Sequence, residues 1–188
     1  MIRPAFVEPV LDSQNCFRAV LEAMSRPGRV QRLTMALDAP APLAPASAAV
    51  LLTLVDAETT LWLDAGAEAE GWIRFHAGCP LAAASDAAFL LATGTPPALA
   101  SLSQGSDESP QDGATLVIQV ESLEEGAGWH LTGPGIEKEH RLAVTGLPAG
   151  FVAERAKLAR NYPRGVDVIL CAGDRLAALP RTTRIEEG

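Results

Sequence analysis

The hydrophobic pattern predicts two helices in the first third of the chain. Apolar residues at positions 17, 20, 21 and 24 recur at i, i+3, i+4 and i+7, which is typical of an amphipathic helix capped by Asp12 or Ser13. Pro27 and Gly28 end this helix, because proline disfavours helical backbone before it and glycine favours a turn. A second, buried helix is expected to start at Pro45 and to run to about residue 56.

Short apolar runs lie between and after these helices. They predict strands at 30–37, 61–63, 73–76, 88–92, 114–120, 128–131, 142–144, 166–171 and 176–179. The most strongly β-branched of them, 114–120, is expected to pair with 128–131 across a turn. Further helices are predicted at 96–102 and 151–161. Because helices and strands interleave without a repeat or a linker, we expect residues 1–188 to form one α/β domain with helices flanking a mixed sheet.

Small side chains provide much of the hydrophobicity, and the composition excludes several classes of protein. Of the 188 residues, 48% are hydrophobic, 33 are alanine and only 5% are aromatic. This apolar fraction excludes a disordered chain, and so many small residues favour close packing of helices against a sheet. The three widely spaced cysteines, Cys16, Cys79 and Cys171, exclude a disulfide-rich class and have no metal-binding spacing.

No segment has the composition of a membrane anchor or a leader peptide. The most apolar run, 48–55, is too short to cross a bilayer. The N-terminal segment carries prolines and acidic residues where a signal peptide needs an apolar run. We therefore expect a reduced, cytoplasmic protein that does not contact a membrane.

Positive charge is scarce and unevenly placed. The formal net charge is −8, and Arg74 is the only lysine or arginine between Arg32 and Lys138. Such a chain lacks the basic stripe of a nucleic-acid-binding protein, so we expect no nucleic-acid partner. Any anionic ligand has to be held by a small set of arginines.

The sequence has no motif that identifies an enzyme, since the GxxxxGK[ST], GxGxxG, GxSxG and HExxH patterns are all absent. Its most unusual stretch contains Arg74 and His76, which would share one face of a strand. A guanidinium fork beside an imidazole suits a phosphoryl or phosphonate oxyanion. The alternative is that Arg74 pairs with a local acid such as Glu70 while His76 packs in the sheet. Cys79 is expected to be a small buried apolar residue.

Two further segments combine cations with turn residues. Arg181 and Thr182 belong to a run of two arginines and two threonines that could hold a phosphate, contact a partner chain or form a polar tail. Arg26 precedes the Pro27–Gly28 turn, where it serves either the end of the helix or a ligand. The glycine-rich turn at 131–136 allows close backbone approach, although it is more often a simple bend.

Two carboxylates are expected to be buried. Asp56 lies at the end of the predicted buried helix, and Asp167 lies inside an apolar strand. A buried carboxylate needs a partner, and arginine is the expected one.

Seven segments in register carry a resemblance to a known family. They are 17–28, 51–63, 74–81, 113–123, 131–136, 165–170 and 180–186. Together they span nearly the whole chain, which resembles the PhnH subunit of the bacterial carbon–phosphorus (C-P) lyase system.

The resemblance implies a fold and the absence of a cofactor. Members of this family look like the large domain of pyridoxal-phosphate-dependent transferases, a three-layer α/β/α fold with a mixed sheet, yet lack the cofactor. The chain has only two lysines, Lys138 and Lys157, and neither has an evident Schiff-base setting. We therefore expect no bound pyridoxal phosphate and no other cofactor.

The resemblance also implies partners and a role. The family forms homodimers and joins a core complex with the PhnG, PhnI and PhnJ subunits. This complex supports formation of ribose 1-phosphonate 5-triphosphate from ATP and a phosphonate, whereas C–P bond cleavage belongs to another subunit.

Two roles remain open for the chain itself. In the first it is a structural, assembly subunit without independent catalysis. In the second it binds a phosphonate or nucleotide triphosphate in a cleft lined by Arg26, Arg74, His76, Arg181 and Thr182.

Overall fold

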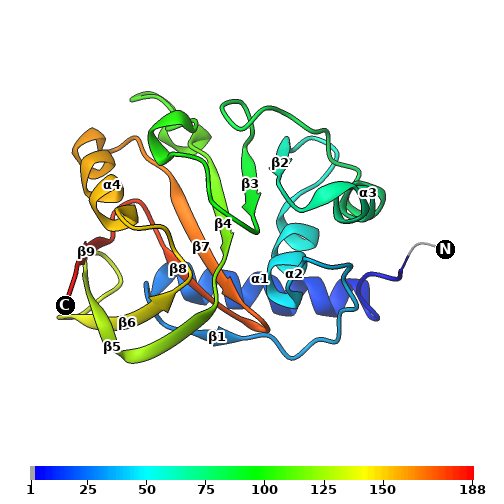
Figure 1. The fold of residues 1–188 in the computed structure, drawn as a ribbon, viewed down its shortest axis with the longest axis horizontal. Helices are drawn as coiled ribbons and strands as arrows, with labels where there is room; N and C mark the ends of the chain where they lie inside the picture. Colours follow the sequence, from blue (N-terminus) through cyan, green and yellow to red (C-terminus); the bar gives the residue numbers. More distant parts are fainter. Residues whose placement is uncertain (1–2) are drawn as a thin grey trace.

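A six-stranded mixed sheet forms the centre of the protein (Figure 1). The structure is a computed structural model that describes residues 3–188. Its elements are α1 (Pro9–Ser25), β1 (Gln31–Arg32), α2 (Pro45–Leu54), β2 (Leu61–Leu63), α3 (Gly66–Ala77), β3 (Phe89–Ala92), η1 (Leu99–Ser101), η2 (Pro110–Asp112), β4 (Thr115–Gln119), β5 (Ser122–Thr132), β6 (His140–Thr145), α4 (Phe151–Leu158), η3 (Ala159–Asn161), β7 (Asp167–Ala172), β8 (Arg175–Leu179) and β9 (Arg184–Glu186). The large sheet has the order β1-β8-β7-β4-β3-β2, and a smaller antiparallel sheet has the order β6-β5-β9.

The predicted strands at 114–120 and 166–171 form the centre of the large sheet. β4 pairs in parallel with β3 on one side and with β7 on the other. Leu116 and Ile118 enter one apolar cluster while Val117 enters the other, so β4 is buried on both faces. This is why it reads as a continuous apolar run, as parallel strands do. The expected pairing with 128–131 is therefore wrong, because β5 pairs with β6 and β9 instead.

Different elements cover the two faces of the large sheet. Buried residues of α1, α2 and α3 form one core cluster with one face, and those of α4, η1, β5 and β6 form a second cluster with the other. Figure 1 shows α4 and the small sheet together at one end of the molecule and α3 at the other. The α/β class and the mixed sheet are confirmed. The second outer layer, however, is an antiparallel sheet with one helix rather than a layer of helices.

The predicted strand at 73–76 is wrong, because these residues form the last turns of α3. Ala69, Trp72 and Ile73 are buried at i, i+3 and i+4, which is the helical period. Gly78, at φ 71°, ends the helix. Residues 73–76 alternate between apolar and polar side chains, but four residues are too few to distinguish strand from helix, whereas the longer window carries the helical signal.

Most other elements agree with the prediction in position, and they differ at their ends. α1 begins at Pro9 rather than near residue 12, and the carboxylate of Asp12 accepts a hydrogen bond from the backbone N–H of Glu8. The strand predicted at 30–37 shrinks to the two residues of β1, because it pairs only with Arg175 and Leu176 at the start of β8. The apolar pattern does not predict β9, which is short and largely polar.

Close backbone contacts dock the loop between β5 and β6 onto the end of α1. Gly135 has φ 83°, and a Cβ atom added to it would clash with the carbonyl oxygen of Ser25. Gly28 meets β5 in the same way, since a Cβ atom added there would clash with Cδ1 of Leu131. These two glycines let the small sheet pack directly against the helix end.

We expect Gly135→Ala to lower the free energy of unfolding by at least about 2 kcal/mol, because it adds a steric clash to the strain of a left-handed backbone. Gly126→Ala is the matched control: its φ is 90°, but nothing lies within 4 Å of the added atom. The control should lose only about 1 kcal/mol. Urea denaturation measures both, and equal losses would contradict the close-packing argument.

Candidate functional site

A largely buried ion pair joins the start of β7 to the segment after β8. Arg181 Nη2 lies 2.6 Å from Asp167 Oδ2, and the backbone N–H of Arg181 donates to Oδ1 at 2.7 Å. The side chains are only 15% and 18% exposed. The expectation that Asp167 has an arginine partner is thus confirmed. The matching expectation for Asp56 is wrong, since that residue is exposed and binds Thr59 within its own turn.

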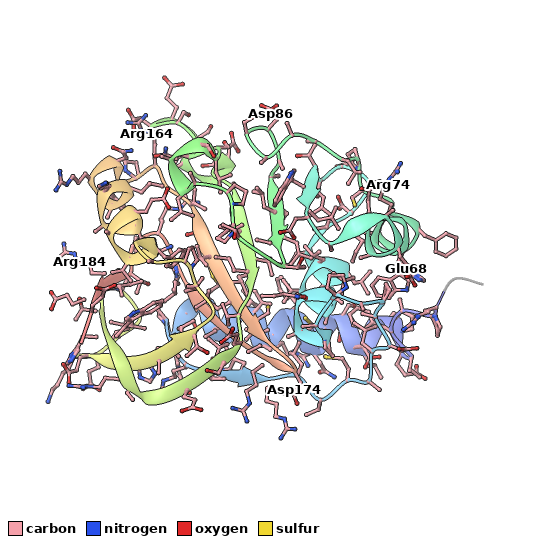
Figure 2. The ribbon with its side chains drawn as sticks, in the orientation of Figure 1. Glu68, Arg74, Asp86, Arg164, Asp174 and Arg184 are labelled. Atoms are coloured by element: carbon pink, nitrogen blue, oxygen red, sulfur yellow. The ribbon has the colours of Figure 1, made fainter. Side chains whose placement is uncertain are left out.

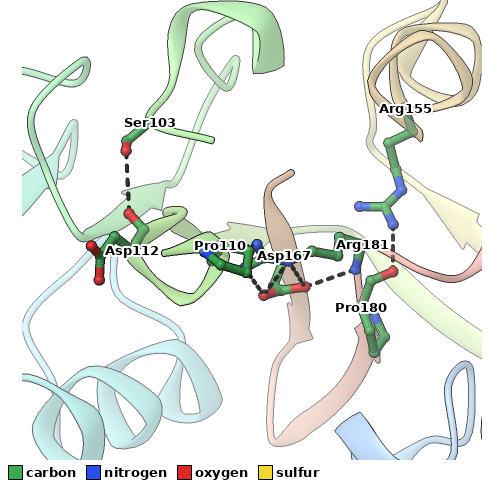
Figure 3. A network of polar contacts seen from close by, with 7 residues as sticks. All are labelled: Ser103, Pro110, Asp112, Arg155, Asp167, Pro180 and Arg181. Atoms are coloured by element: carbon green, nitrogen blue, oxygen red, sulfur yellow. Dashed lines mark hydrogen bonds and ion pairs between the residues drawn. The ribbon is translucent and has the colours of Figure 1, made fainter. Parts of the chain in front are cut away.

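Each nitrogen of the Arg181 guanidinium donates to a protein oxygen. Its Nε lies 3.2 Å from both oxygens of Asp167, and its Nη1 donates to the carbonyl of Pro110 in η2. Figure 3 shows these contacts as one network. In this arrangement Arg181 anchors the chain, and its predicted contact with a ligand stays a prediction.

Arg155 of α4 extends this network to the second face of the sheet. Its Nη2 donates to the carbonyl oxygen of Pro180 at 2.9 Å, and the backbone N–H of Thr183 donates to the same oxygen at 2.9 Å. Burial lowers the pKa of Arg155 to about 10, an effect that the charge of Asp167 partly opposes. Figure 3 shows the Arg155 side chain reaching from the helix to Pro180.

Sequence reasoning missed Arg155, although a signal was present. The buried residues of α4 are Phe151, Val152, Arg155 and Leu158. An arginine on the apolar stripe of an amphipathic helix is expected to be buried, and a buried charge has to find partners.

The structure brings Arg26 and Thr182 to the same glycine-rich turn. Arg26, which pairs with Glu22 at 3.2 Å, lines a groove of about 280 Å³ together with Gly135 and Lys138. On the other side of the turn, a Cβ on Gly133 would lie 2.9 Å from the carbonyl oxygen of Thr182. Three of the segments that carry the family resemblance, 17–28, 131–136 and 180–186, therefore meet at this turn.

Arg74 and His76 lie on α3, far from that turn. Figure 2 shows Arg74 at the opposite end of the molecule from Arg184, which follows the Arg181 segment. Arg74 pairs with Glu70 at 3.7 Å, as the alternative interpretation expected. His76 Nε2 lies 3.0 Å from the carbonyl oxygen of Arg3, so it packs on a helix end and not in the sheet. The five candidate residues do not line one cleft.

The described residues contain three buried thiols and no cluster of metal-ligating side chains. Cys16, Cys79 and Cys171 are all buried, and burial raises the pKa of each thiol, which keeps it protonated. Within 3–188 no three metal-ligating side chains come together. Over the same range, every helix is too short or too polar to cross a bilayer.

Comparison with known proteins assigns the chain to a family. The family model described as bacterial phosphonate metabolism protein (PhnH) matches residues 4–186. The chain is 38% identical to alpha-D-ribose 1-methylphosphonate 5-triphosphate synthase subunit PhnH of Rhizobium meliloti, over 97% of this chain and 94% of that protein. It is also 38% identical to HtxG of Stutzerimonas stutzeri, named as a candidate C-P lyase subunit protein, over 92% and 85% of the two chains.

These matches point to one class, the proteins of bacterial phosphonate metabolism. Within that class the chain belongs to the PhnH family, and the resemblance drawn from its sequence is confirmed.

We expect Arg181→Met to lower the free energy of unfolding by about 3 kcal/mol, because it leaves the charge of Asp167 buried without its partner. Arg164→Met is the control, since it removes an exposed pair with Asp107, at 3.2 Å. That change should cost less than about 1 kcal/mol. Urea denaturation of both variants checks the difference, and similar values would show that the Asp167 pair does not anchor the fold.

Proposed function

We propose that this chain is a subunit of a C-P lyase complex that acts mainly in assembly. The observation that carries the proposal is the family match over residues 4–186, together with two relatives whose names call them subunits. The proposed complex contains PhnG, PhnI and PhnJ and supports formation of ribose 1-phosphonate 5-triphosphate from ATP and a phosphonate. Its cytoplasmic location stays a prediction.

The predicted ligand-binding residues lie apart from one another, which favours a role in assembly over a role in ligand binding. Arg74 and Arg181 are each paired with a carboxylate of this chain, and Arg74 lies on α3 whereas Arg181 follows β8. Arg26 lines a groove, and it too has an acidic partner. Ligand binding by these residues remains the second candidate, supported by the meeting of the Arg26 and Thr182 segments at one turn.

An exposed apolar stripe on α1 supports a role in association. Large apolar side chains on this helix and just before it are 45–74% exposed: Val7, Val10, Leu11, Phe17 and Leu21. The opposite face of α1 packs in the core. Large apolar side chains exposed together on one helix are typical of an interaction surface.

The stripe fits a second copy of the same chain. Val10, Phe17 and Leu21 lie on one seam of α1, at spacings of seven and four residues, as in paired helices. A two-fold interface uses the same patch on both subunits, so one stripe covers the other. We therefore propose that the chain forms a homodimer and that α1 forms the dimer interface.

The fold is proposed to be that of the pyridoxal-phosphate transferase large domain without the cofactor. The mixed sheet with a helical layer on one face supports this assignment. Lys157 is exposed on α4, and Lys138 is exposed on the loop before β6. Neither lysine has the enclosed setting that a Schiff base needs, so the described residues do not fit the cofactor.

The test of the proposed function is co-purification combined with growth. A tagged chain, expressed with PhnG, PhnI and PhnJ from the same genome, should co-purify with them and restore growth on methylphosphonate to a strain that lacks it. Arg74→Ala should leave both results unchanged if the role is assembly. Loss of growth with an intact complex would indicate ligand binding at Arg74, and failure to co-purify would overturn the proposal.

We expect the double variant Phe17→Glu/Leu21→Glu to be monomeric, because two carboxylates would be buried in the α1 interface. Light scattering coupled to size-exclusion chromatography measures the mass of wild type and variant. Phe75→Glu is the matched control, because Phe75 is 65% exposed on α3, away from the stripe. A dimeric double variant, or a control that also dissociates, would contradict the assignment.

A further inference from the structure

A cavity between α4 and β9 contains buried donors without partners. It has a volume of about 260 Å³, several times the roughly 30 Å³ of a water molecule in the liquid. Arg155 and Thr183 both line it and are only 7% and 4% exposed. Within the described residues, Nε of Arg155 and Oγ1 of Thr183 are buried and have no hydrogen-bond partner.

Among the described residues Arg155 has no acidic partner in an ion pair, and this is the main indication of a ligand. A buried guanidinium is costly unless a negative charge lies against it. Asp167, whose charge raises the pKa of Arg155, already binds Arg181, and none of the ion pairs among residues 3–188 includes Arg155. The hydrogen bond to Pro180 uses only Nη2 of Arg155. The contact that holds the turn therefore leaves the buried Nε–H without a hydrogen-bond acceptor.

The remaining lining is suited to a small anion. Half of the lining residues are apolar: Val152, Ala156, Ala159 and Ile185. Arg184 at the rim adds a second guanidinium, while the one carboxylate of the lining, Glu186, is exposed to solvent. Two guanidiniums and a hydroxyl form a donor set that matches a tetrahedral oxyanion, because such an ion accepts several hydrogen bonds at once.

We infer that this cavity binds a small oxyanion of the phosphate or phosphonate type, held by the guanidinium of Arg155 and the hydroxyl of Thr183 with Arg184 at the rim. The site differs from the groove at Arg26 and from the pair at Arg74. The inference rests on the local geometry, and it does not require that the chain act in assembly.

Binding of inorganic phosphate and of methylphosphonate to the purified full chain, measured by calorimetry, tests the site. Thr183→Val keeps the shape of the side chain and removes only the hydroxyl, so we expect it to weaken binding about tenfold. Arg155→Gln should weaken binding at least as much. Arg164→Ala, which changes an arginine outside the cavity, should leave the affinity unchanged. Tighter binding of methylphosphonate than of phosphate would identify the organic ion as the ligand.

Several outcomes would overturn the inference. Equal affinity of wild type and Thr183→Val would place the anion elsewhere, and no binding of either ion to the chain or to its complex would exclude the site. Because Arg155 also supports the Pro180 turn, circular dichroism has to show that Arg155→Gln is folded. If the folded Arg155→Gln chain fails to co-purify while wild type binds no anion, the cavity instead receives a partner subunit's carboxylate. Failure of assembly with unchanged anion binding would contradict only the proposed function.

Discussion

The ion pair between Asp167 and Arg181 is the constraint on which the arrangement around the second face depends. Asp167 starts a central strand, and it accepts both the backbone N–H and the guanidinium of Arg181. This fixes the turn that follows β8, and the carbonyl of Pro180 in that turn then receives Arg155 from α4. A buried pair stabilises little compared with apolar packing, but breaking it is costly, so it determines geometry more than total stability.

Features that depend on local patterns could be predicted from the sequence. The apolar runs of β4 and β7 and the proline-led α2 lie where the pattern places them, and the partner of Asp167 follows from the cost of burying a charge. The wrong predictions concern which strands pair and whether a short segment has the period of a helix or of a strand. β4 pairs with β3 and with β7, which is distant in the chain, instead of with the strand that follows it. The short segment inside α3 fits either period until its neighbours are included.

The candidate site shows a second limit of sequence reasoning. Arg74 stands out because no other cation is near it in the sequence, yet on α3 it finds Glu70 one turn away. Arg155 is one of several arginines in its region, yet it is the one that is buried without a charged partner in the described part of the chain. Isolation along the chain does not predict isolation in space, because a helix supplies neighbours at i±4 to any surface residue. Burial on an apolar stripe is the better signal.

The two proposed surfaces belong to opposite faces of the large sheet, which allows both to operate at once. α1 packs in the cluster on one face, whereas α4 and β9 form the cavity on the other. A dimer formed through α1 therefore leaves the cavity open. The cavity itself requires α4, the Pro180 turn and β9, and the Asp167 pair holds the turn to which α4 is bound through Arg155. An anion bound there would compensate the charge of Arg155 only in the completed fold, and would stabilise that fold by mass action.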